Sequence, residues 1–440
     1  MYILSADFGT TSLKLSIVDE SLKIISSTKQ AYDYDLINDI WCQIDPEVIF
    51  RAFIDGLGRF DIDPGKIDIL SICVLCPALI AMNRDGKNLY PAIIHLDRRS
   101  VKQAKRALQI VGKKRFLEIN GNLPFPGGIS FTSILWLREN QPDVYKRTFV
   151  FGHLNTYLQK IFTDKFVIDP TNASFTGLYE TLKWGGWSRE LCSALDIPIS
   201  KLPDIVPSHQ ILGGLKKRAS VLTGLKEGIP VVMGANDTSS AALGAGAIEN
   251  GSILNISGSN EIITITTDRP IPHERVYLRT HAIEGRWLIL AITTGGCALE
   301  WFREEFYREM DSKFFYEEYF PDFIKNRFRK SEIIFLPYLA GDRHNITQKR
   351  ARFDGITLDT GREDFLAALL QGMFEPITMV MDIYRERIAL KKEIILTGGM
   401  VNNAYLDFKR GIFKDFCFKR VKECSTIGNA RLALMGLKHC

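Results

Sequence analysis

The sequence lacks most of the short motifs that identify a chemistry on their own. It contains no GxxxxGK[ST] loop, no GxGxxG turn placed after a strand, no HExxH pair and no GxSxG elbow. Local signatures of P-loop, dinucleotide, zinc-protease and serine-hydrolase sites are therefore absent. The one close cysteine pair, Cys73 and Cys76, has no second pair to complete a zinc site. Eight scattered cysteines are typical of a reducing cytosol.

Long apolar and long basic stretches are also missing. No window of about 18 residues is uninterruptedly apolar, so we expect no membrane span. The N-terminus has no basic segment and carries Asp7 in its first apolar stretch, which argues against a signal peptide. The net charge of +5 is too dilute over 440 residues to predict a nucleic-acid partner. We interpret the basic piece Lys216-Lys217-Arg218 as solvated surface and expect a cytoplasmic protein.

What the chain does have is the length and pattern of an α/β protein. With 440 residues, 46% of them apolar, it is long enough for two domains with sizeable cores. Strand and helix patterns alternate in the first half, which predicts an α/β architecture. The expected elements are a hairpin over 3–17, a helix over 46–57 capped by Asp45, a strand over 67–82, and helices over 101–119 and 130–139.

A stretch rich in Gly and Lys over 212–230 predicts a domain boundary, with one domain over 1–228 and the other over 229–440. The second domain repeats a feature of the first. The segments 3–19 and 252–268 have equal length, turn at a glycine in the same relative place and continue as an alternating strand. This similarity suggests two like-folded halves, each with a glycine-turn hairpin.

The first hairpin tip reads Asp7-Phe8-Gly9-Thr10-Thr11-Ser12. Backbone N–H groups and hydroxyls at such a tip form a concavity that suits phosphate, and Gly9 allows close approach. A carboxylate beside it could hold hydrated Mg²⁺. The tip is therefore a candidate phosphate and metal site, and the alternative is an ordinary polar hairpin.

Two further stretches place small polar residues after a strand. Asp237 follows the strand predicted over 229–233, at the carboxyl end of a sheet where α/β proteins bind ligands. It could accept a proton from a hydroxyl that attacks phosphorus, or it could simply cap a helix. Gly398 and Gly399 follow a strand over 393–396 and could let a purine lie against backbone, or could serve only as a strand-to-helix turn.

Taken together and in order, these pieces resemble the FGGY family of carbohydrate kinases over nearly the whole chain. The segments that carry the resemblance are DFGTTSLK, NRDGKNLYPAIIHLDRRS, DPTNASFTGLYE, GANDTSSAALGAG, GSN at 258–260, FLPYLAGDR, the Gly398-Gly399 turn and ECSTIGNARLALMG, together with Trp41 and Asp45-Pro46.

The resemblance implies two actin-like domains of the ribonuclease H type around a deep cleft, and transfer of the γ-phosphoryl group of ATP to a small sugar or polyol. It implies that the first domain mainly binds sugar and the second mainly binds ATP. Asp237 would be the catalytic base and Asp7 would position Mg²⁺. The ATP and phosphate contacts would come from Gly9, Thr10, Thr11, Gly258, Ser259, Gly398, Gly399 and Asn403. The sugar contacts would come from Cys76, Pro77, Asp97, Asp237 and Thr238.

Some positions depart from the family pattern. Cys76-Pro77 stands where xylulose kinases have Met-His, and Met400 replaces a third glycine of the adenosine motif. A ketose such as xylulose is the first expectation for the acceptor. A different polyol, a sugar acid, a catalytically silent sugar sensor and an actin-like ATPase without a sugar substrate remain alternatives. The sequence does not fix the oligomeric state, although dimers are common in the family that it resembles.

Overall fold

The computed structural model describes residues 1–38, 40–339, 341–400 and 402–439. The chain forms two compact units. The first contains residues 1–248, 268–288 and 423–440, and the second contains residues 249–267 and 289–422. The predicted boundary at 228/229 falls inside the first unit, because the strand that follows it pairs with the sheet of that unit.

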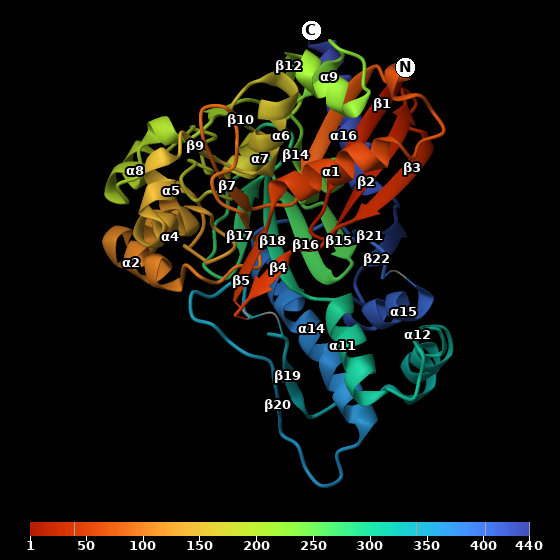
Figure 1. The fold of residues 1–440 in the computed structure, drawn as a ribbon. Helices are drawn as coiled ribbons and strands as arrows, with labels where there is room; N and C mark the ends of the chain where they lie inside the picture. The colour runs from red at the N-terminus through yellow and green to blue at the C-terminus, as the bar shows by residue number, and fades with distance from the viewer. Residues whose placement is uncertain (39, 340, 401, 440) are drawn as a thin grey trace. The chain divides into compact units, whose positions relative to one another are not determined.

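Figure 1 shows the strands and helices with their labels. The strands of the first unit are β1 (Tyr2–Phe8), β2 (Ser12–Asp19), β3 (Ile24–Ala31), β4 (Asp35–Ile37), β5 (Trp41–Ile44), β6 (Ile69–Val74), β7 (Ala78–Met82), β8 (Ala92–Ile94), β9 (Val150–Gly152), β10 (Val167–Ile168), β11 (Asp204–Ile205), β12 (Ile211–Gly214), β13 (Pro230–Val232), β14 (Ala235–Asn236) and β17 (Tyr277–Thr280). Its helices are α1 (Pro46–Leu57), α2 (Val101–Val111), α3 (Lys113–Ile119), α4 (Phe131–Asn140), α5 (Pro142–Arg147), α6 (Leu154–Thr163), α7 (Pro170–Ala173), α8 (Arg189–Ala194), α9 (Lys217–Thr223), α10 (Asp237–Ala245) and α16 (Cys424–Lys438).

The main sheet of this unit has the order β12-β13-β6-β1-β2-β3, and β14 also pairs with β6. The predicted hairpin is confirmed as the antiparallel pair β1 and β2. On its other side β1 pairs in parallel with β6, and β6 pairs in parallel with β13 and β14. The parallel strands β1, β6 and β14 therefore end at the same edge of the sheet.

Side-chain alternation along β1 assigns its two faces to different helices. Leu4, Ala6 and Phe8 belong to one buried cluster, together with residues of α1. Ile3 belongs to another cluster with residues of α16. In Figure 1, α1 lies in front of this sheet and α16 behind it. The sheet is thus covered on both faces, as strongly apolar parallel strands require.

Helix α1 begins and ends at the predicted residues, and its cap is also confirmed, since the Asp45 side chain accepts a hydrogen bond from the backbone N–H of Glu47. Two predicted elements are each divided in the structure. The strand predicted over 67–82 is β6 and β7, which lie in different sheets and are separated at Pro77, a residue without an N–H to donate to a ladder. The helix predicted over 101–119 is α2 and α3, separated at Gly112 with a φ of 83°.

The second unit repeats this plan. Its strands are β15 (Ile253–Ser257), β16 (Asn260–Thr267), β18 (Trp287–Thr294, in this unit from residue 289), β19 (Ile334–Leu336), β20 (Arg352–Asp354), β21 (Glu393–Thr397) and β22 (Cys417–Arg420). Its α-helices are α11 (Gly296–Phe306), α12 (Ser312–Phe314), α13 (Phe320–Asp322), α14 (Arg362–Arg385) and α15 (Asn403–Ile412). The order β18-β16-β15-β21-β22 matches β3-β2-β1-β6-β13, with an antiparallel hairpin followed by parallel strands. The predicted second hairpin is confirmed.

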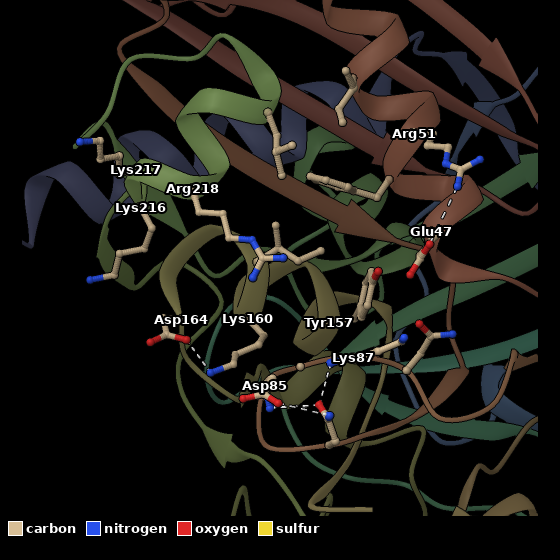
Figure 2. Close-up of a pocket in the computed structure, with 17 residues that line it drawn as sticks. Glu47, Arg51, Asp85, Lys87, Tyr157, Lys160, Asp164, Lys216, Lys217 and Arg218 are labelled. Carbon is tan, nitrogen blue, oxygen red and sulfur yellow. Dashed lines mark hydrogen bonds and ion pairs between the residues drawn. The ribbon is translucent and has the colours of Figure 1, made fainter.

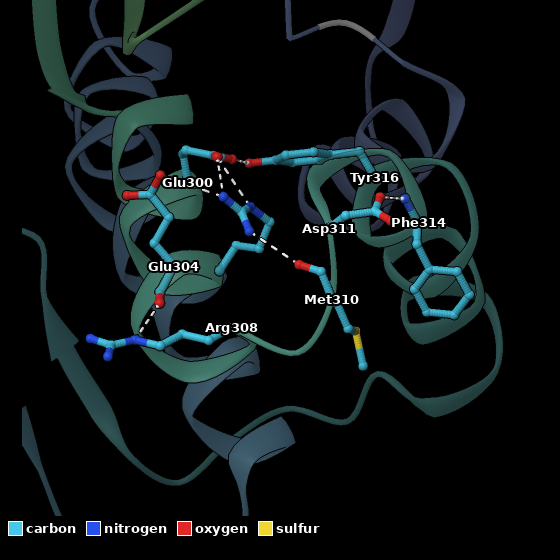
Figure 3. A network of polar contacts seen from close by, with 8 residues as sticks. Glu300, Glu304, Arg308, Met310, Asp311, Phe314 and Tyr316 are labelled. Carbon is cyan, nitrogen blue, oxygen red and sulfur yellow. Dashed lines mark hydrogen bonds and ion pairs between the residues drawn. The ribbon is translucent and has the colours of Figure 1, made fainter.

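A polar network fixes the segment that follows α11 in the second unit (Figure 3). Glu300 accepts hydrogen bonds from the Arg303 guanidinium and from the Tyr316 hydroxyl, the latter at 2.7 Å. Arg303 also donates to the Met310 carbonyl at 3.1 Å. The network ties the second half of α11 to the segment that follows it.

Helix α14 is long and apolar enough to cross a membrane by length and composition alone. In the structure 61% of its most apolar window is buried inside the protein. Its buried side chains include Leu366, Leu370 and Phe374, which is typical of a core helix.

The glycine before β14 provides a test of how the sheet edge is built. Gly234 has a φ of 79°, and a Cβ there would lie 1.9 Å from the Ile72 carbonyl oxygen. Gly246 has a similar φ of 77°, but a Cβ there would meet nothing within 4 Å. We expect Gly246→Ala to cost about 1 kcal/mol of unfolding free energy, from backbone strain alone. Gly234→Ala should cost about 3 kcal/mol, because the clash adds to that strain. Urea denaturation of the two variants checks this, and equal losses would contradict it.

Candidate active site

The register of the parallel strands brings two predicted acidic residues to one edge of the first sheet. Asp7 of β1 lies beside Cys73 of β6, and Cys73 lies beside Ala235 of β14. Asp237 follows β14 by one residue, at the start of α10. Because all three strands run in the same direction, Asp7, Cys73 and Asp237 lie at the carboxyl ends of adjacent strands, where open α/β sheets bind ligands.

Asp7 is a partly buried carboxylate with few hydrogen-bond donors. It accepts from the Ser425 hydroxyl at 2.5 Å and from the Cys73 thiol at 3.3 Å. Burial raises the pKa of the carboxyl, although these two contacts and the charge of Lys14 oppose the shift. Lys14 itself is paired with Glu423. The Asp7 carboxylate therefore attracts a nearby cation more strongly than an exposed carboxylate would.

The predicted phosphate residues Gly9, Thr10 and Thr11 form the turn between β1 and β2. The turn is closed by a 3.0 Å bond from the Gly9 N–H to the Ser12 carbonyl. Beside it lies an open hollow of about 450 Å³ lined by Asp7, Gly9, Ser12, Lys14, Ser27, Thr28 and Lys29. Two ammonium groups, backbone amides and hydroxyls in one hollow suit an anion such as phosphate.

Asp237 is not the cap of its helix. Asn236 is the N-cap, and its side chain accepts from the Ser239 N–H at 2.8 Å. The Asp237 carboxylate accepts from the backbone N–H and hydroxyl of Thr238, at 2.6 and 3.2 Å. The carboxylate thus lies in the first turn, where the helix dipole favours a negative charge. The helix cap that the sequence suggested for Asp237 is therefore Asn236.

Asp169 forms a buried hub that fixes the backbone of this segment. It accepts hydrogen bonds from the side chains of Asn155, Asn172 and Ser208 and from both the N–H and the hydroxyl of Thr171. The Thr171 hydroxyl oxygen in turn accepts from the Asn236 N–H at 2.8 Å. Asp169 therefore positions the residue that immediately precedes Asp237.

The predicted sugar contact Cys76 lies just beyond β6 and beside a buried histidine. The Cys76 sulfur is 3.5 Å from His153 Nδ1, and His153 Nε2 is 2.9 Å from the Ser130 hydroxyl. Burial lowers the pKa of His153 to about 3 and, with Asp237 nearby, raises that of Cys76. Both groups are therefore neutral at pH 7, as Pro77 is, and this wall of the site carries no formal charge.

Arg279, which sequence reasoning missed, adds a buried charge close to this wall. Its guanidinium donates to the carbonyls of Ser174 and Gly128, at 2.8 and 3.1 Å, and lies over the Phe175 ring. Burial lowers its pKa to about 10. Within the described ranges no carboxylate forms an ion pair with it, and its Nε has no hydrogen-bond partner. A cation in an apolar strand, YLRT, was the available signal.

Asp97 occupies a different position from the other predicted sugar contacts. It is fully buried and accepts from the Cys42 N–H, the Arg99 N–H and Arg99 Nε, the last at 2.8 Å. Arg99 is stacked over Trp41 and Trp136. Contact of Asp97 with a sugar stays a prediction, and its complete burial in an ion pair counts against it. Thr238 is also buried, beside Asp237.

In the second unit, the predicted residues gather at the corresponding edge. Gly258 and Ser259 form the turn between β15 and β16, and their carbonyls accept from the first N–H groups of α11. Gly398 and Gly399 follow β21, which pairs in parallel with β15. Gly398 has a φ of 113°, and a Cβ there would lie 2.2 Å from the Ser257 carbonyl. A Cβ on Gly399 would meet nothing within 4 Å, so the backbone presents an open face there.

Two neighbouring residues complete this edge. The Met400 thioether packs on Gly296, so the residue that departs from the adenosine motif fills space against the first turn of α11. Asn403 begins α15, and its side-chain oxygen accepts from Arg420 at 3.0 Å. The cap of α15 is Asn402.

Comparison with known proteins supports the same interpretation. Residues 2–244 match the model of the N-terminal domain of the FGGY family of carbohydrate kinases. The chain belongs to this family. It is 25% identical to a xylulose kinase of Staphylococcus xylosus, over 99% of this chain and 91% of the relative. It is 26% identical to a glycerol kinase of Thermococcus kodakarensis, over 98% and 88%. The crystal structure of a gluconate kinase from Lactobacillus acidophilus aligns with a TM-score of 0.86 at 22% identity, over 100% of this chain and 90% of that one.

These similarities confirm the predicted family and the fold of two actin-like α/β units. The alignments with these relatives extend over nearly the whole chain, so the similarity continues well beyond the residues that match the family model. The relatives are named for three different acceptors at similar identity, and the similarity alone therefore does not select a substrate. The roles of individual residues in this carbohydrate kinase remain predictions.

A buried ionic network lies directly behind the second hairpin and was also missed. The Lys409 ammonium donates to Glu261, Asn255 and Ser257, each at 2.5 Å, and the Tyr405 hydroxyl donates to Glu261 at 3.0 Å. Lys409 and Glu261 are fully buried. Burial lowers the Lys409 pKa and Glu261 opposes the shift. The network joins α15 to both strands of the hairpin that carries Gly258 and Ser259.

The sequence held a signal for this network. Lys409 follows Tyr405 by four residues on α15, so both lie on the same helix face, and Glu261 shares a strand face with Ile263 and Ile265. A charge on each of two apolar faces indicates a buried pair, but neither pattern alone identifies the partner.

Breaking the buried pair should be costly. We expect Lys409→Met to lower the unfolding free energy by about 3–5 kcal/mol, since it leaves Glu261 buried without a counter-charge. Adding Glu261→Gln should recover more than half of that loss. Lys391→Met, which breaks an exposed pair with Glu249, should leave the urea midpoint nearly unchanged. A double variant as unstable as Lys409→Met would contradict the electrostatic explanation.

The buried charge of Asp7 predicts a pH-dependent stability difference. The folded-state pKa lies above the ordinary 3.8, so the neutral form is favoured in the fold and stability is lost as pH rises through the raised pKa. Asp7→Asn should therefore melt at a higher temperature than the ligand-free wild type at pH 7, and the difference should shrink towards pH 4. Asp169→Asn is the matched control and should be destabilised, because an amide cannot accept from all five donors. A lower melting temperature for Asp7→Asn at pH 7 would contradict the prediction.

Proposed function

We propose that this protein transfers the γ-phosphoryl group of ATP to a hydroxyl of a small sugar, with Asp237 as the general base. The observation that carries the proposal is the register that puts Asp7, Cys73 and Asp237 at the ends of three adjacent parallel strands. A carboxylate at that edge can take the proton of a sugar hydroxyl while its oxygen attacks phosphorus. Free cysteines throughout the described chain agree with a cytoplasmic setting.

We assign a different set of contacts to each unit. In the first, the 9–12 turn supplies amides and hydroxyls for the transferring phosphoryl group, and Cys76, Pro77 and Thr238 border the acceptor. In the second, Gly258 and Ser259 contact phosphate, and Gly398, Gly399 and Asn403 hold the nucleoside. Such donors act by stabilising negative charge as it shifts between oxygens. The open backbone face at Gly399 fits a nucleotide lying against it.

Asp7 is the residue that would hold Mg²⁺. A single carboxylate suits this ion, which keeps several waters and binds substrate phosphates. No group of three or more His, Cys, Asp or Glu side chains within the described ranges could form an all-protein metal site. Magnesium would neutralise phosphate charge, and the partly buried Asp7 carboxylate, which lines the hollow beside the 9–12 turn, would be its protein ligand.

A ketose such as xylulose is the first candidate acceptor, in line with the relative from Staphylococcus xylosus. A sugar acid is the second candidate, because Arg279 is buried near Cys76 and pairs with no carboxylate within the described ranges. A carboxylate on the acceptor would be attracted by that charge without direct contact, since Arg279 is only 1% exposed.

The test is ADP release from ATP with Mg²⁺ across ketoses, aldoses, sugar acids and polyols. One acceptor should stimulate release strongly, and Asp237→Asn should lower kcat for it by about 10²–10⁴-fold. Asp415→Ala, which removes an exposed carboxylate of the second unit, should leave kcat unchanged. If xylulose stimulates ADP release and gluconate does not, the acceptor is a ketose. If gluconate stimulates release and xylulose does not, the acceptor is a sugar acid. Full activity of Asp237→Asn would refute the base, and release that no acceptor stimulates would refute the kinase.

A further inference from the structure

The first unit contains a second hollow that the kinase site does not use (Figure 2). It has a volume of about 930 Å³ and lies among α1, the loop over 83–88, α6 and the start of α9. Its apolar surface includes Phe50 and Tyr157. The volume is in the range of pockets that hold small molecules.

The walls of this hollow carry an excess of positive charge. The basic side chains are Arg51, Lys87, Lys160, Lys216, Lys217 and Arg218, against three acidic ones, Glu47, Asp85 and Asp164. The excess of three charges falls on 17 lining residues, while the whole chain of 440 carries only +5. A concave wall of one sign concentrates the electrostatic potential in the hollow.

The ion pairs show which of these basic side chains have an acidic partner. Lys160 pairs with Asp164 at 2.5 Å, and Arg51 lies 4.0 Å from Glu47. Among the described residues, none of Lys87, Lys216, Lys217 and Arg218 forms an ion pair. In Figure 2, Arg218 extends from α9 towards the side of the hollow that carries Tyr157 and Lys160. The tripeptide that looked like solvated surface in the sequence therefore contributes one wall of a cavity.

The opposite wall is rigid. The Asn83 side chain accepts from the N–H groups of Asp85 and Lys87, at 3.0 and 2.9 Å, and fixes the loop. Gly86, with a φ of 85°, packs so closely on the Lys160 stem that a Cβ would lie 2.5 Å from it. The side chain of Lys160 is consequently only 13% exposed. The backbone of this wall therefore needs little ordering when a ligand binds, although the exposed Lys87 side chain is not held.

We propose that this hollow is a binding site for a small anion that carries more than one phosphate group, separate from the kinase site. Two walls with unpaired cations match a ligand with anionic groups at both ends. Charge-assisted contacts from Lys and Arg to phosphate oxygens would supply the affinity. Phe50 and Tyr157 provide an apolar surface for whatever lies between the phosphates.

Titration calorimetry of the full-length protein tests the proposal, with tripolyphosphate as the probe. The wild type should bind it, and Lys217→Gln/Arg218→Gln should raise Kd by at least about tenfold. Lys102→Gln/Lys105→Gln is the matched control. It removes the same charge from exposed positions on α2, outside the hollow, and should leave Kd within about twofold. Inorganic phosphate should bind the wild type more weakly than tripolyphosphate.

A third variant separates the hollow from the phosphate turn of the kinase site. Ser259→Ala should keep the wild-type Kd for tripolyphosphate, whether or not the proposed kinase activity exists. Loss of binding in Ser259→Ala with retention in Lys217→Gln/Arg218→Gln would place the probe at the turn and overturn the proposal. Equal losses in the pocket variant and its control, no binding to the wild type, or equal affinity for inorganic phosphate would also overturn it.

Discussion

The pairing of β6 with parallel strands on both sides is the constraint on which the candidate site depends. A strand between parallel neighbours is buried on both faces, and all six residues of β6 are buried. Its neighbours must end where it ends, which brings Asp7 and Asp237 to one edge although 230 positions separate them in the chain. Gly234 enables the last step, because only glycine fits against the Ile72 carbonyl as the chain enters β14. The closeness of these two carboxylates is a consequence of sheet register.

The second unit repeats the hairpin and its parallel partner but distributes charge differently. The first hairpin has a carboxylate at its edge, whereas the second has glycines and a serine there and keeps its carboxylate, Glu261, behind the turn in a buried pair with Lys409. An exposed carboxylate beside Gly258 and Ser259 would repel phosphate. Because Glu261 is buried behind the Gly258-Ser259 turn and paired with Lys409, it stabilises the turn without that repulsion. The same scaffold thus places a carboxylate at the hairpin edge of one unit and leaves that edge without a carboxylate in the other.

Local patterns predicted much of the fold. Asp45 and Pro46 fixed the start of α1, and alternation identified both hairpins, because these signals act over a few residues. The division of residues 67–82 into two strands depended on Pro77, which the apolar pattern concealed. The predicted edges of the site were found from residues that follow strands. Asp169, Arg279 and Lys409 were not, because the value of a buried polar residue depends on partners that are distant in sequence.

The contrast between Asp7, which is partly buried, and Asp169, which is fully buried, bears on how this site is prepared. Asp169 accepts from five donors, which oppose the rise that burial causes in its pKa and set its geometry before any ligand arrives. Asp7 has only a hydroxyl and a thiol, the latter a weak donor. Adding donors to Asp7 would stabilise the fold but would compete with a metal for the same lone pairs. A carboxylate with few fixed donors is the pattern expected of a functional rather than a structural group.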